Sequence, residues 1–152
     1  MKRIYAREEY CIGCRLCEVH CLVEHSESKN IIKAFKREFP RGMNRARVRV
    51  EEDGPLSFGL QCRHCTEPVC VYSCLNGAMY IDTDGAVRHD AEKCMGCWTC
   101  IMVCSFGAIK RGERKGNSHK IAFKCDLCPG RETPACVENC PNEALVLREE
   151  EA

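Results

Sequence analysis

The stretch "CIGCRLCEVHC", residues 11–21, carries four cysteines with two, two and three residues between them: Cys11, Cys14, Cys17 and Cys21. Thiolate sulfur is a soft ligand that suits both iron–sulfur and zinc sites. Three cysteines at this spacing can present their sulfurs around one tight loop. The stretch therefore predicts a metal centre bound by cysteine sulfur.

The chain repeats this arrangement three more times. It has 152 residues and 16 cysteines, which form four quartets with none left over. The further quartets are Cys62, Cys65, Cys70 and Cys74; Cys94, Cys97, Cys100 and Cys104; and Cys125, Cys128, Cys136 and Cys140. The middle gap widens in the second and fourth quartets, whereas the two outer gaps never change. A constant outer spacing indicates that a bound group fixes the distances between these cysteines.

Composition limits the kind of fold and the kind of partner. Cysteines supply much of the apolar content, so we expect an inorganic core to replace part of the ordinary hydrophobic core. The formal net charge is +1, which offers no general case for binding nucleic acid or a membrane surface. No apolar run approaches the roughly 20 residues that span a bilayer, so we expect no direct membrane insertion. "MKRIYAREEY" lacks the features of a secretion signal, and this favours the cytoplasm, where thiols stay reduced.

The spacing favours iron–sulfur cubanes. The first three cysteines of a quartet would bind three irons of one cubane, and the fourth, carried into a following helix, would reach the neighbouring cluster, as in the bacterial ferredoxin run. Sixteen ligands then bind four [4Fe–4S] clusters in two reciprocal pairs. Zinc sites usually set two C-x2-C pairs well apart and do not need the third cysteine, and a disulfide framework fits less well still. One zinc site in the stretched fourth quartet remains an alternative.

Short strands are expected around the cysteine loops. An alanine follows the last cysteine of each of the later three quartets by four residues and opens a short apolar segment, in "CLNGAMYI", "CSFGAIKR" and "CPNEALVL". The segments "KRIYA", "SFGLQ", "AVRHD" and "IAFK" precede the quartets and are also typical of strands. An Asp-Gly pair in "YIDTDGAVRHD", residues 80–90, predicts a hairpin. The fold class is α+β, with short strands and short helices around the clusters.

Two such units resemble a bacterial-type dicluster ferredoxin, and four resemble the polyferredoxin electron-transfer subunits of large redox enzymes. The resemblance implies two dicluster units, one inserted within the other: an outer unit of residues 1–25 and 120–152, a basic insert at 26–56 and an inner unit at 57–119. It implies these ligand sets: Cys11, Cys14, Cys17 with Cys140; Cys125, Cys128, Cys136 with Cys21; Cys62, Cys65, Cys70 with Cys104; and Cys94, Cys97, Cys100 with Cys74. Pairing of the first quartet with the second is the rival. Only Cys140 has the proline that usually follows the last cysteine.

The insert between the first two quartets is strongly basic. Residues 29–49 contain eight Lys or Arg and one acidic residue, Glu38. Ile31, Ile32, Phe35 and Phe39 have helical spacing, Pro40-Arg41-Gly42 would end that helix, and "ARVRVEE" alternates like a strand. A solvated face is the plainest interpretation; the alternatives are a docking surface for an acidic partner or a positive field that favours reduced clusters. Four basic residues beside cluster cysteines could act in the same way: Arg15, Arg63, Lys93 and Lys124.

Two histidines and one tryptophan stand beside the cysteines. His20 and His64 would be ligands only if a cysteine were left surplus, and the cysteine count closes without them. We therefore expect neither to bind iron. Trp98, inside the third quartet, is expected to shield a cluster from water.

The motifs indicate conduction of electrons. No dinucleotide-binding or phosphate-binding glycine motif is present, and no quartet is incomplete, so we expect no catalytic residues. A redox sensor is the alternative from another class, but such proteins usually carry an output domain. The opening "CIGCRLCEVHCLVEHS" resembles the small iron–sulfur protein associated with nickel carbon monoxide dehydrogenase. This resemblance implies a hetero-oligomeric complex in which electrons pass from that enzyme to a hydrogenase or a flavin-dependent NAD(P) oxidoreductase. The alternative is the beta subunit of a soluble molybdenum or tungsten formate dehydrogenase, or of a formate-hydrogenlyase-type complex.

Overall fold

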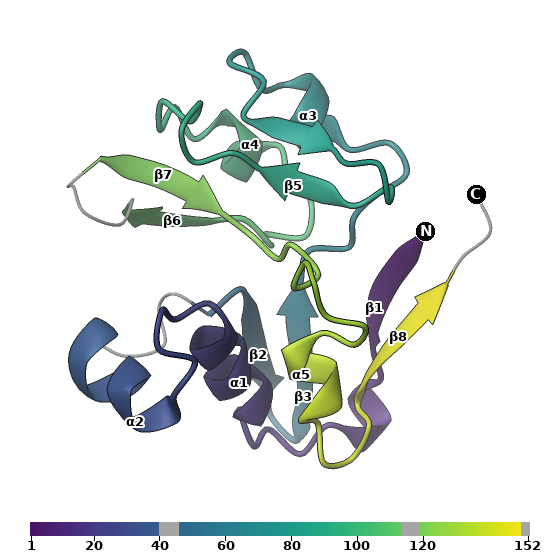
Figure 1. Ribbon diagram of the computed structural model, residues 1–152. Coiled ribbons are helices and arrows are strands. Elements are labelled where there is room, and N and C mark those ends of the chain that lie inside the picture. Colours follow the sequence, from purple (N-terminus) through teal and green to yellow (C-terminus); the bar gives the residue numbers. More distant parts are fainter. Residues whose placement is uncertain (40–45, 114–118, 150–152) are drawn as a thin grey trace. The chain divides into compact units, whose positions relative to one another are not determined.

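The computed structural model describes residues 1–39, 46–113 and 119–149 (Figure 1). The chain divides into two compact units. Unit 1 consists of Met1–Arg3, Cys62–Leu127 and Glu149–Ala152, and unit 2 of Ile4–Gln61 and Cys128–Arg148. Each unit thus combines segments that are distant in the sequence. The predicted boundaries at residues 25, 56 and 119 stay a prediction.

The strands pair two by two within the described residues. β1 (Lys2–Ala6) pairs with β8 (Leu145–Glu149), and β2 (Val48–Asp53) with β3 (Leu56–Gln61). β4 (Met79–Ile81) pairs with β5 (Val87–His89), and β6 (Lys110–Glu113) with β7 (Lys120–Phe123). These strands confirm the expected extended segments. Short two-stranded sheets have little apolar area of their own, so other contacts must stabilise them.

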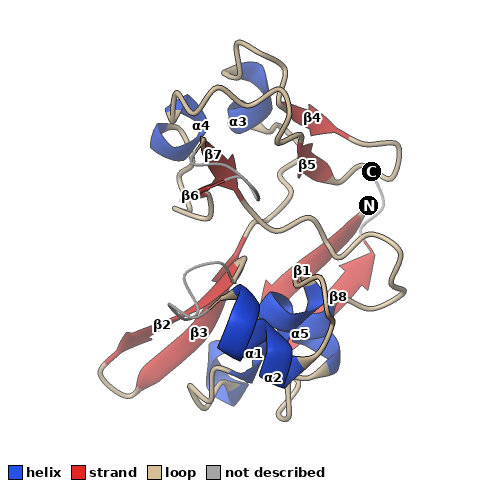
Figure 2. Ribbon diagram, turned by 60° about the vertical axis from the view of Figure 1, so that its left-hand side comes forward, coloured by secondary structure: helices blue, strands red, loops and turns tan. Residues whose placement is uncertain are grey.

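In unit 2, helix α1 (Leu16–Glu24) packs against α5 (Ala135–Glu138) and against β2 (Figure 2). The 3-10 helix η1 (Glu8–Tyr10) precedes the first cysteine loop. β2 and β3 form an antiparallel hairpin in which Val48 faces Gln61. The side chains of Leu22, Val48, Val50 and Leu145 are buried and form the apolar part of this unit.

The basic insert belongs to unit 2. The predicted helix is present as α2 (Ile31–Lys33), continued by a π-helical turn, η2 (Ala34–Glu38). The Asn30 side chain accepts a hydrogen bond from the Lys33 amide and so caps the start of α2. The predicted stop at Pro40-Arg41-Gly42 lies outside the described residues.

In unit 1, α3 (Val69–Tyr72) and α4 (Thr99–Met102) lie beside the β4–β5 and β6–β7 hairpins. The predicted hairpin at residues 80–90 is confirmed: Tyr80 faces Arg88, and Gly85 adopts a φ of 79° in the turn. A small core of Met79, Ile109, Ala122 and Cys100 is packed against further cysteines: Cys70, Cys74, Cys94 and Cys104. Cysteines thus make up much of the interior of this unit.

One expectation about the helices is wrong. We expected the fourth cysteine of each quartet in a helix, and only Cys21 is, inside α1. Cys74, Cys104 and Cys140 follow α3, α4 and α5, whose last residues are Tyr72, Met102 and Glu138. In these three helices the third cysteine is helical instead, because the helices are only four residues long and end before the fourth is reached.

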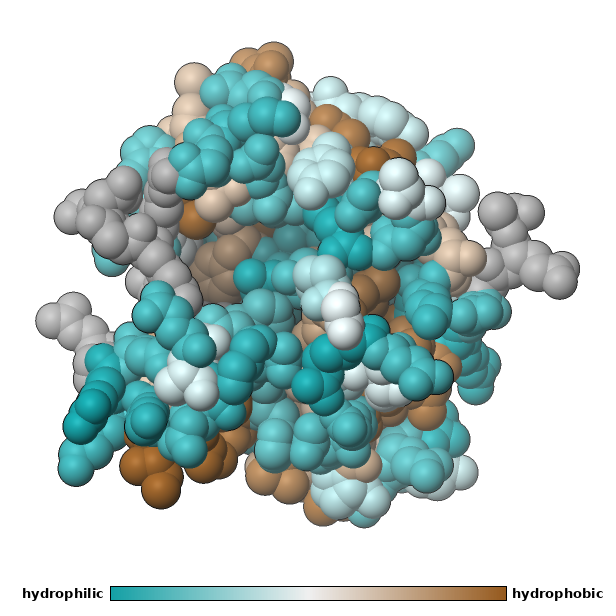
Figure 3. Space-filling view, viewed as in Figure 1, coloured by the Kyte–Doolittle hydropathy of each residue, from teal (hydrophilic) through white to brown (hydrophobic). Residues whose placement is uncertain are grey.

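Most of the face shown in Figure 3 is hydrophilic, with separate hydrophobic patches. None of the helices in the described part of the chain combines the length and the apolar character needed to cross a bilayer.

Candidate iron–sulfur centres

The first two cysteines of every quartet enclose the same backbone turn. The residue just before the second cysteine has a positive φ in all four loops: 66° at Gly13, 46° at His64, 73° at Gly96 and 61° at Leu127. A left-handed residue turns the chain sharply between the two cysteines. Glycine occupies this position in two loops because it adopts such a φ without strain.

Four cysteines of unit 2 line one cavity. Cys11 and Cys14 come from the loop before α1, Cys17 from α1 itself, and Cys140 from the turn after α5. The cavity has about 370 Å³ of empty space, part of it open to solvent, and is also lined by Tyr10, Ile12, Arg15, Val50, Gly59, Pro141, Asn142, Ala144 and Leu145. The structure therefore gathers the cysteines that nested pairing assigns to one cluster.

Four cysteines of unit 1 line a second cavity, with about 360 Å³ of empty space. Cys94, Cys97 and Cys100 come from the third quartet, and Cys74 from the second. Trp98 and Met79 also line it, and Arg111 stacks over the Trp98 ring at 5.1 Å from its centroid. Trp98 thus lies where the sequence analysis expects it, at the wall of a cysteine-lined cavity.

Charge interactions between thiols indicate a third set of neighbouring cysteines. Burial raises the pKa of Cys70 to about 11, and the charges of Cys62, Cys104 and Cys65 raise it further. These charge interactions indicate that the other three sulfurs lie near that of Cys70, and Cys70 and Cys104 also pack against one buried core. These cysteines, all in unit 1, are the ones that nested pairing assigns to one cluster.

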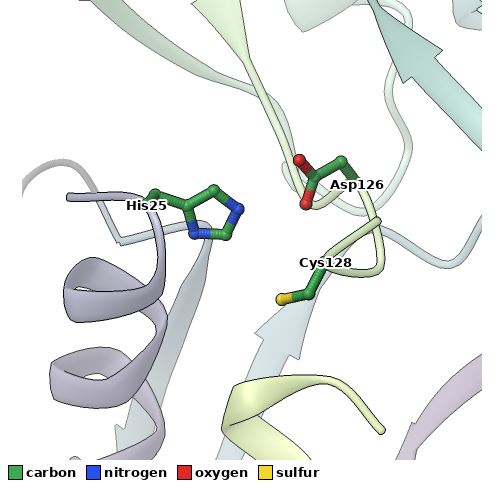
Figure 4. Close-up of side chains that lie close together, drawn as sticks. All are labelled: His25, Asp126 and Cys128. Atoms are coloured by element: carbon green, nitrogen blue, oxygen red, sulfur yellow. The ribbon is translucent and has the colours of Figure 1, made fainter. Parts of the chain in front are cut away.

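For the remaining expected set, Cys125, Cys128, Cys136 and Cys21, the structure shows proximity for only some of the members. Cys21, Cys128 and Cys136 belong to unit 2 and are buried. His25 and Cys128 place a ring nitrogen and Sγ within 4.8 Å of each other (Figure 4). His25 Nδ1 also lies 2.7 Å from the carbonyl oxygen of Cys21 and 3.8 Å from its Sγ. His25 therefore connects two cysteines of the expected set, while Cys125 lies in unit 1.

The positions of His20 and His64 beside cysteines stand out in the sequence, whereas that of His25 does not. Only the spacing of His25, four residues after Cys21 on the same helix, could have indicated the contact. The proximity to Cys128 depends on tertiary packing, for which the sequence carries no signal.

Backbone amides donate to several of the sulfurs. Ala144 N–H lies 3.2 Å from Cys140 Sγ, and Met79 N–H lies 3.4 Å from Cys74 Sγ. Arg47 N–H lies 3.2 Å from Cys21 Sγ. Hydrogen bonds of this kind stabilise thiolates and raise the reduction potential of a cluster that they bind.

Burial makes several thiols costly to ionise without a metal. It raises the pKa of Cys17 to about 12, assisted by Glu18, and that of Cys100 to about 11, assisted by Cys94 and Cys74. The exposed Cys97 behaves differently, because hydrogen bonds from Thr99 lower its pKa. A metal that binds the thiolate form replaces these protons and removes the cost.

His64 is buried completely and lies in the Cys62–Cys65 loop. Its Nδ1 accepts a hydrogen bond of 3.1 Å from the Val87 amide, so the proton of the neutral ring is on Nε2. Nε2 is buried and has no hydrogen-bond partner among the described residues. A buried donor without a partner fits a loop that surrounds an acceptor such as cluster sulfide.

The donor set, the two cavities and the His64 Nε2 group all fit iron–sulfur clusters. A family model described as "4Fe-4S dicluster domain" matches residues 56–150. The chain belongs to the 4Fe-4S dicluster domain family. It is therefore an iron–sulfur protein that binds multiple [4Fe–4S] clusters.

Curated relatives of this dicluster protein span nearly all of it. It is 37% identical over 154 residues to "Iron-sulfur protein" of Rhodospirillum rubrum, covering 93% of this chain and 79% of that protein. It is 36% identical over 155 residues to "Electron transport protein HydN" of Escherichia coli strain K12, covering 94% of this chain and 85% of that one. It is also 34% identical to "Putative oxidoreductase AegA" of the same strain, covering 95% of this chain but only 21% of AegA.

A solved structure shares the fold. The dicluster protein is similar, with a TM-score of 0.52 and 28% sequence identity, to a chain of the "Active site complex BamBC of Benzoyl Coenzyme A reductase in complex with Benzoyl-CoA". The match covers 100% of this chain and 81% of that one. The fold is thus a small, cysteine-rich, ferredoxin-like arrangement of short helices and strands.

Proposed function

We propose that this protein is an electron-transfer subunit that holds four [4Fe–4S] clusters and has no catalytic site of its own. The observation that carries the proposal is the gathering of Cys17 with Cys140, and of Cys100 with Cys74, around cavities that each contain four cysteines. Every cysteine of the chain then has a role as a ligand. No position is left over for a substrate.

The proposed ligand sets are those of nested pairing. The cavity of unit 2 supports the set with Cys140, the cavity of unit 1 supports the set with Cys74, and the coupling of Cys70 to Cys104 supports a third. The proximity of His25 to Cys21 and Cys128 supports the placement of these two cysteines in the fourth set. Pairing of the first quartet with the second would require Cys17 and Cys74 in one set, whereas one cavity is lined by Cys17 with Cys140 and the other by Cys74 with Cys100.

A bound [4Fe–4S] cluster supplies one-electron transfer over a wide range of potentials. The chain supplies the surroundings. Buried cysteines, the wall formed by Trp98, and apolar neighbours such as Leu145 and Val50 keep water away from the sulfurs. Amide donors from Met79, Ala144 and Arg47 hold the sulfurs in place. Little rearrangement is then needed when charge is added or removed.

The proposed electron donor is carbon monoxide dehydrogenase, and the proposed acceptor is a hydrogenase or a flavin-dependent NAD(P) oxidoreductase. This rests on the resemblance of residues 11–26; the relatives reported above are not described by that partner. A second candidate is the electron-transfer subunit of a formate-oxidising or similar complex. Another relative, 31% identical and described as "Thiosulfate reductase electron transfer subunit PhsB" of Salmonella typhi, favours a subunit role of this general kind.

Stopped-flow mixing distinguishes the two donors. The oxidised protein is mixed anaerobically with carbon monoxide dehydrogenase and carbon monoxide, and in parallel with a formate dehydrogenase and formate, while cluster absorbance is followed. We expect bleaching at least about tenfold faster with the first enzyme. Equal rates would contradict the proposed donor. Clusters that no donor enzyme and no low-potential chemical reductant can reduce would contradict conduction itself.

A further inference from the structure

Lys124 is a buried cation in unit 1. Lys124 is only 3% exposed to solvent, although a lysine is almost never fully buried without a partner for its charge. The ammonium donates to the carbonyl oxygens of Val87 and Cys125, the latter at 2.7 Å. Both acceptors are neutral. They fix the position of Nζ but do not neutralise it.

The same ammonium acts on two cysteines of one proposed ligand set. Burial raises the pKa of Cys62, and the charge of Lys124 and a hydrogen bond from it work against that increase. Its charge likewise opposes the increase at Cys70. The printed contacts agree with this placement: Lys124 Nζ donates to the carbonyl of Val87, the amide of Val87 donates to His64 Nδ1, and the amide of His64 lies 3.4 Å from Cys62 Sγ.

The side chains of His64 and Lys124 both form hydrogen bonds with the backbone of Val87. The amide of Val87 donates to His64 Nδ1, and the carbonyl of Val87 accepts from Lys124 Nζ. The side chains of His64 and Lys124 are thus both held by the backbone of Val87, the first residue of β5 (Val87–His89). Together they give this loop one buried positive charge and one buried N–H donor without a partner among the described residues.

We propose that Lys124, placed by Val87, is the countercharge of the cluster bound by Cys62, Cys65, Cys70 and Cys104 and raises its reduction potential. A cluster ligated by four thiolates carries net negative charge, and each added electron increases it. A fixed cation in a poorly solvated site favours the reduced form, since low dielectric strengthens the attraction. The inference rests on the proposed function. It singles out one cluster as an electron-accepting position within the chain.

The test compares Lys124→Met with Lys93→Met and Lys124→Arg. Lys93 is a matched control: it also precedes a cluster cysteine, but its side chain is 63% exposed and pairs with Asp90 at 3.6 Å. In EPR-monitored redox titrations, we expect Lys124→Met to lower the equilibrium constant for reduction of one cluster at least about tenfold, a shift of about 59 mV for one electron. Lys93→Met and Lys124→Arg should change it less than about twofold, because solvent screens the first site and the second variant keeps the charge.

Combination with Cys104→Ser identifies the affected cluster. In that background the cluster bound with Cys62 is removed, and Lys124→Met should shift none of the remaining signals. A Lys124→Met shift no larger than that of Lys93→Met, in protein with unchanged iron content, would overturn the inference while leaving the proposed function intact. Failure of the parent protein to bind clusters would count against the proposed function instead.

A measurement on the unmodified chain covers the case in which Lys124→Met loses its clusters. Protein labelled with ε-¹⁵N lysine is reduced and studied by pulsed EPR. A ¹⁵N hyperfine coupling is expected from an ammonium in hydrogen-bonding contact with a cluster ligand, and it should vanish in Lys124→Arg. Absence of any lysine coupling would overturn the inference.

Discussion

Cys17, near the start of the chain, lines the same cavity as Cys140, near its end. The two residues are brought together because α1 packs against α5 within unit 2. Their sulfurs are also coupled electrostatically, since Cys140 contributes to the raised pKa of Cys17 after the larger effects of burial and Glu18. Because one cluster would then depend on both residues, the pairing of quartets can be tested by measuring the iron content of cysteine variants.

If Cys14 and Cys140 bind the same cluster, their substitutions will not be additive. Cys14→Ser and Cys140→Ser should each lose about four irons per chain, and the double variant should lose the same four. A matched control joins Cys14→Ser with Cys104→Ser, which nested pairing places on different clusters, and should lose about eight. Pairing of the first quartet with the second would instead give a loss of about eight for Cys14→Ser with Cys140→Ser.

Charge reversal in the basic insert tests whether it is a docking surface for an acidic partner or a solvated face. Lys36 and Arg37 are exposed on η2, and Lys36→Glu with Arg37→Glu should slow electron transfer from the partner at least about tenfold at low salt and weaken its salt dependence. Lys2→Glu with Arg148→Glu makes the same change of charge on the β1–β8 sheet and should have a smaller effect. Unchanged rates at every ionic strength would leave the insert as a solvated face.

Gly96 is expected to tolerate no side chain. It has a φ of 73°, and a Cβ there would lie 2.4 Å from the backbone oxygen of Lys120. Gly96→Ala should therefore destabilise the protein by at least about 2 kcal/mol more than Gly107→Ala and reduce the iron content. Gly107 is the matched control because its φ is 57° and nothing lies within 4 Å of its Cβ position. Equal urea midpoints and equal iron contents for the two variants would contradict this reasoning.

His64 should make the protein sensitive to acid. Burial, followed by the charge of Lys124, lowers its pKa to about 3, whereas an unfolded histidine titrates near about 6.5. As the pH falls below about 6.5, His64 therefore binds a proton in the unfolded chain but not in the folded chain. The contribution of His64 to stability is complete above about pH 6.5 and is lost on acidification, by up to about 1.4 kcal/mol per pH unit.

His64→Asn should reduce this dependence, since asparagine does not titrate and tolerates the left-handed backbone of 46°. The readout is the urea midpoint between about pH 5 and 7, followed anaerobically by cluster absorbance. His119→Asn serves as the control because His119 is exposed. Parallel curves for His64→Asn and the parent protein would show that His64 is not the source of the acid sensitivity.

Local features were predictable from the sequence because each has a local cause. The Asp84-Gly85 pair specifies the turn between β4 and β5, and the C-x2-C spacing specifies loops that turn through a left-handed residue such as Gly13. The alternation of "ARVRVEE" specifies β2, in which Val48 and Val50 are buried and Arg49 is exposed.

Other features depend on contacts between distant segments. The π-helical turn η2 follows an ordinary helical pattern, and its Glu38 carboxylate accepts hydrogen bonds from the amides of Glu27 and Ser28. The burial of Lys124 depends on β5, and the contact of His25 with Cys128 depends on how α1 is packed. No periodicity or spacing in the sequence predicts contacts between such distant segments.

The proposed function requires all sixteen cysteines to bind iron in four complete cubanes. Iron and sulfide analysis of anaerobically purified and fully reconstituted protein tests it most directly. We expect about sixteen irons and about sixteen sulfides per chain. Substantially fewer irons, or zinc in stoichiometric amount, would contradict it.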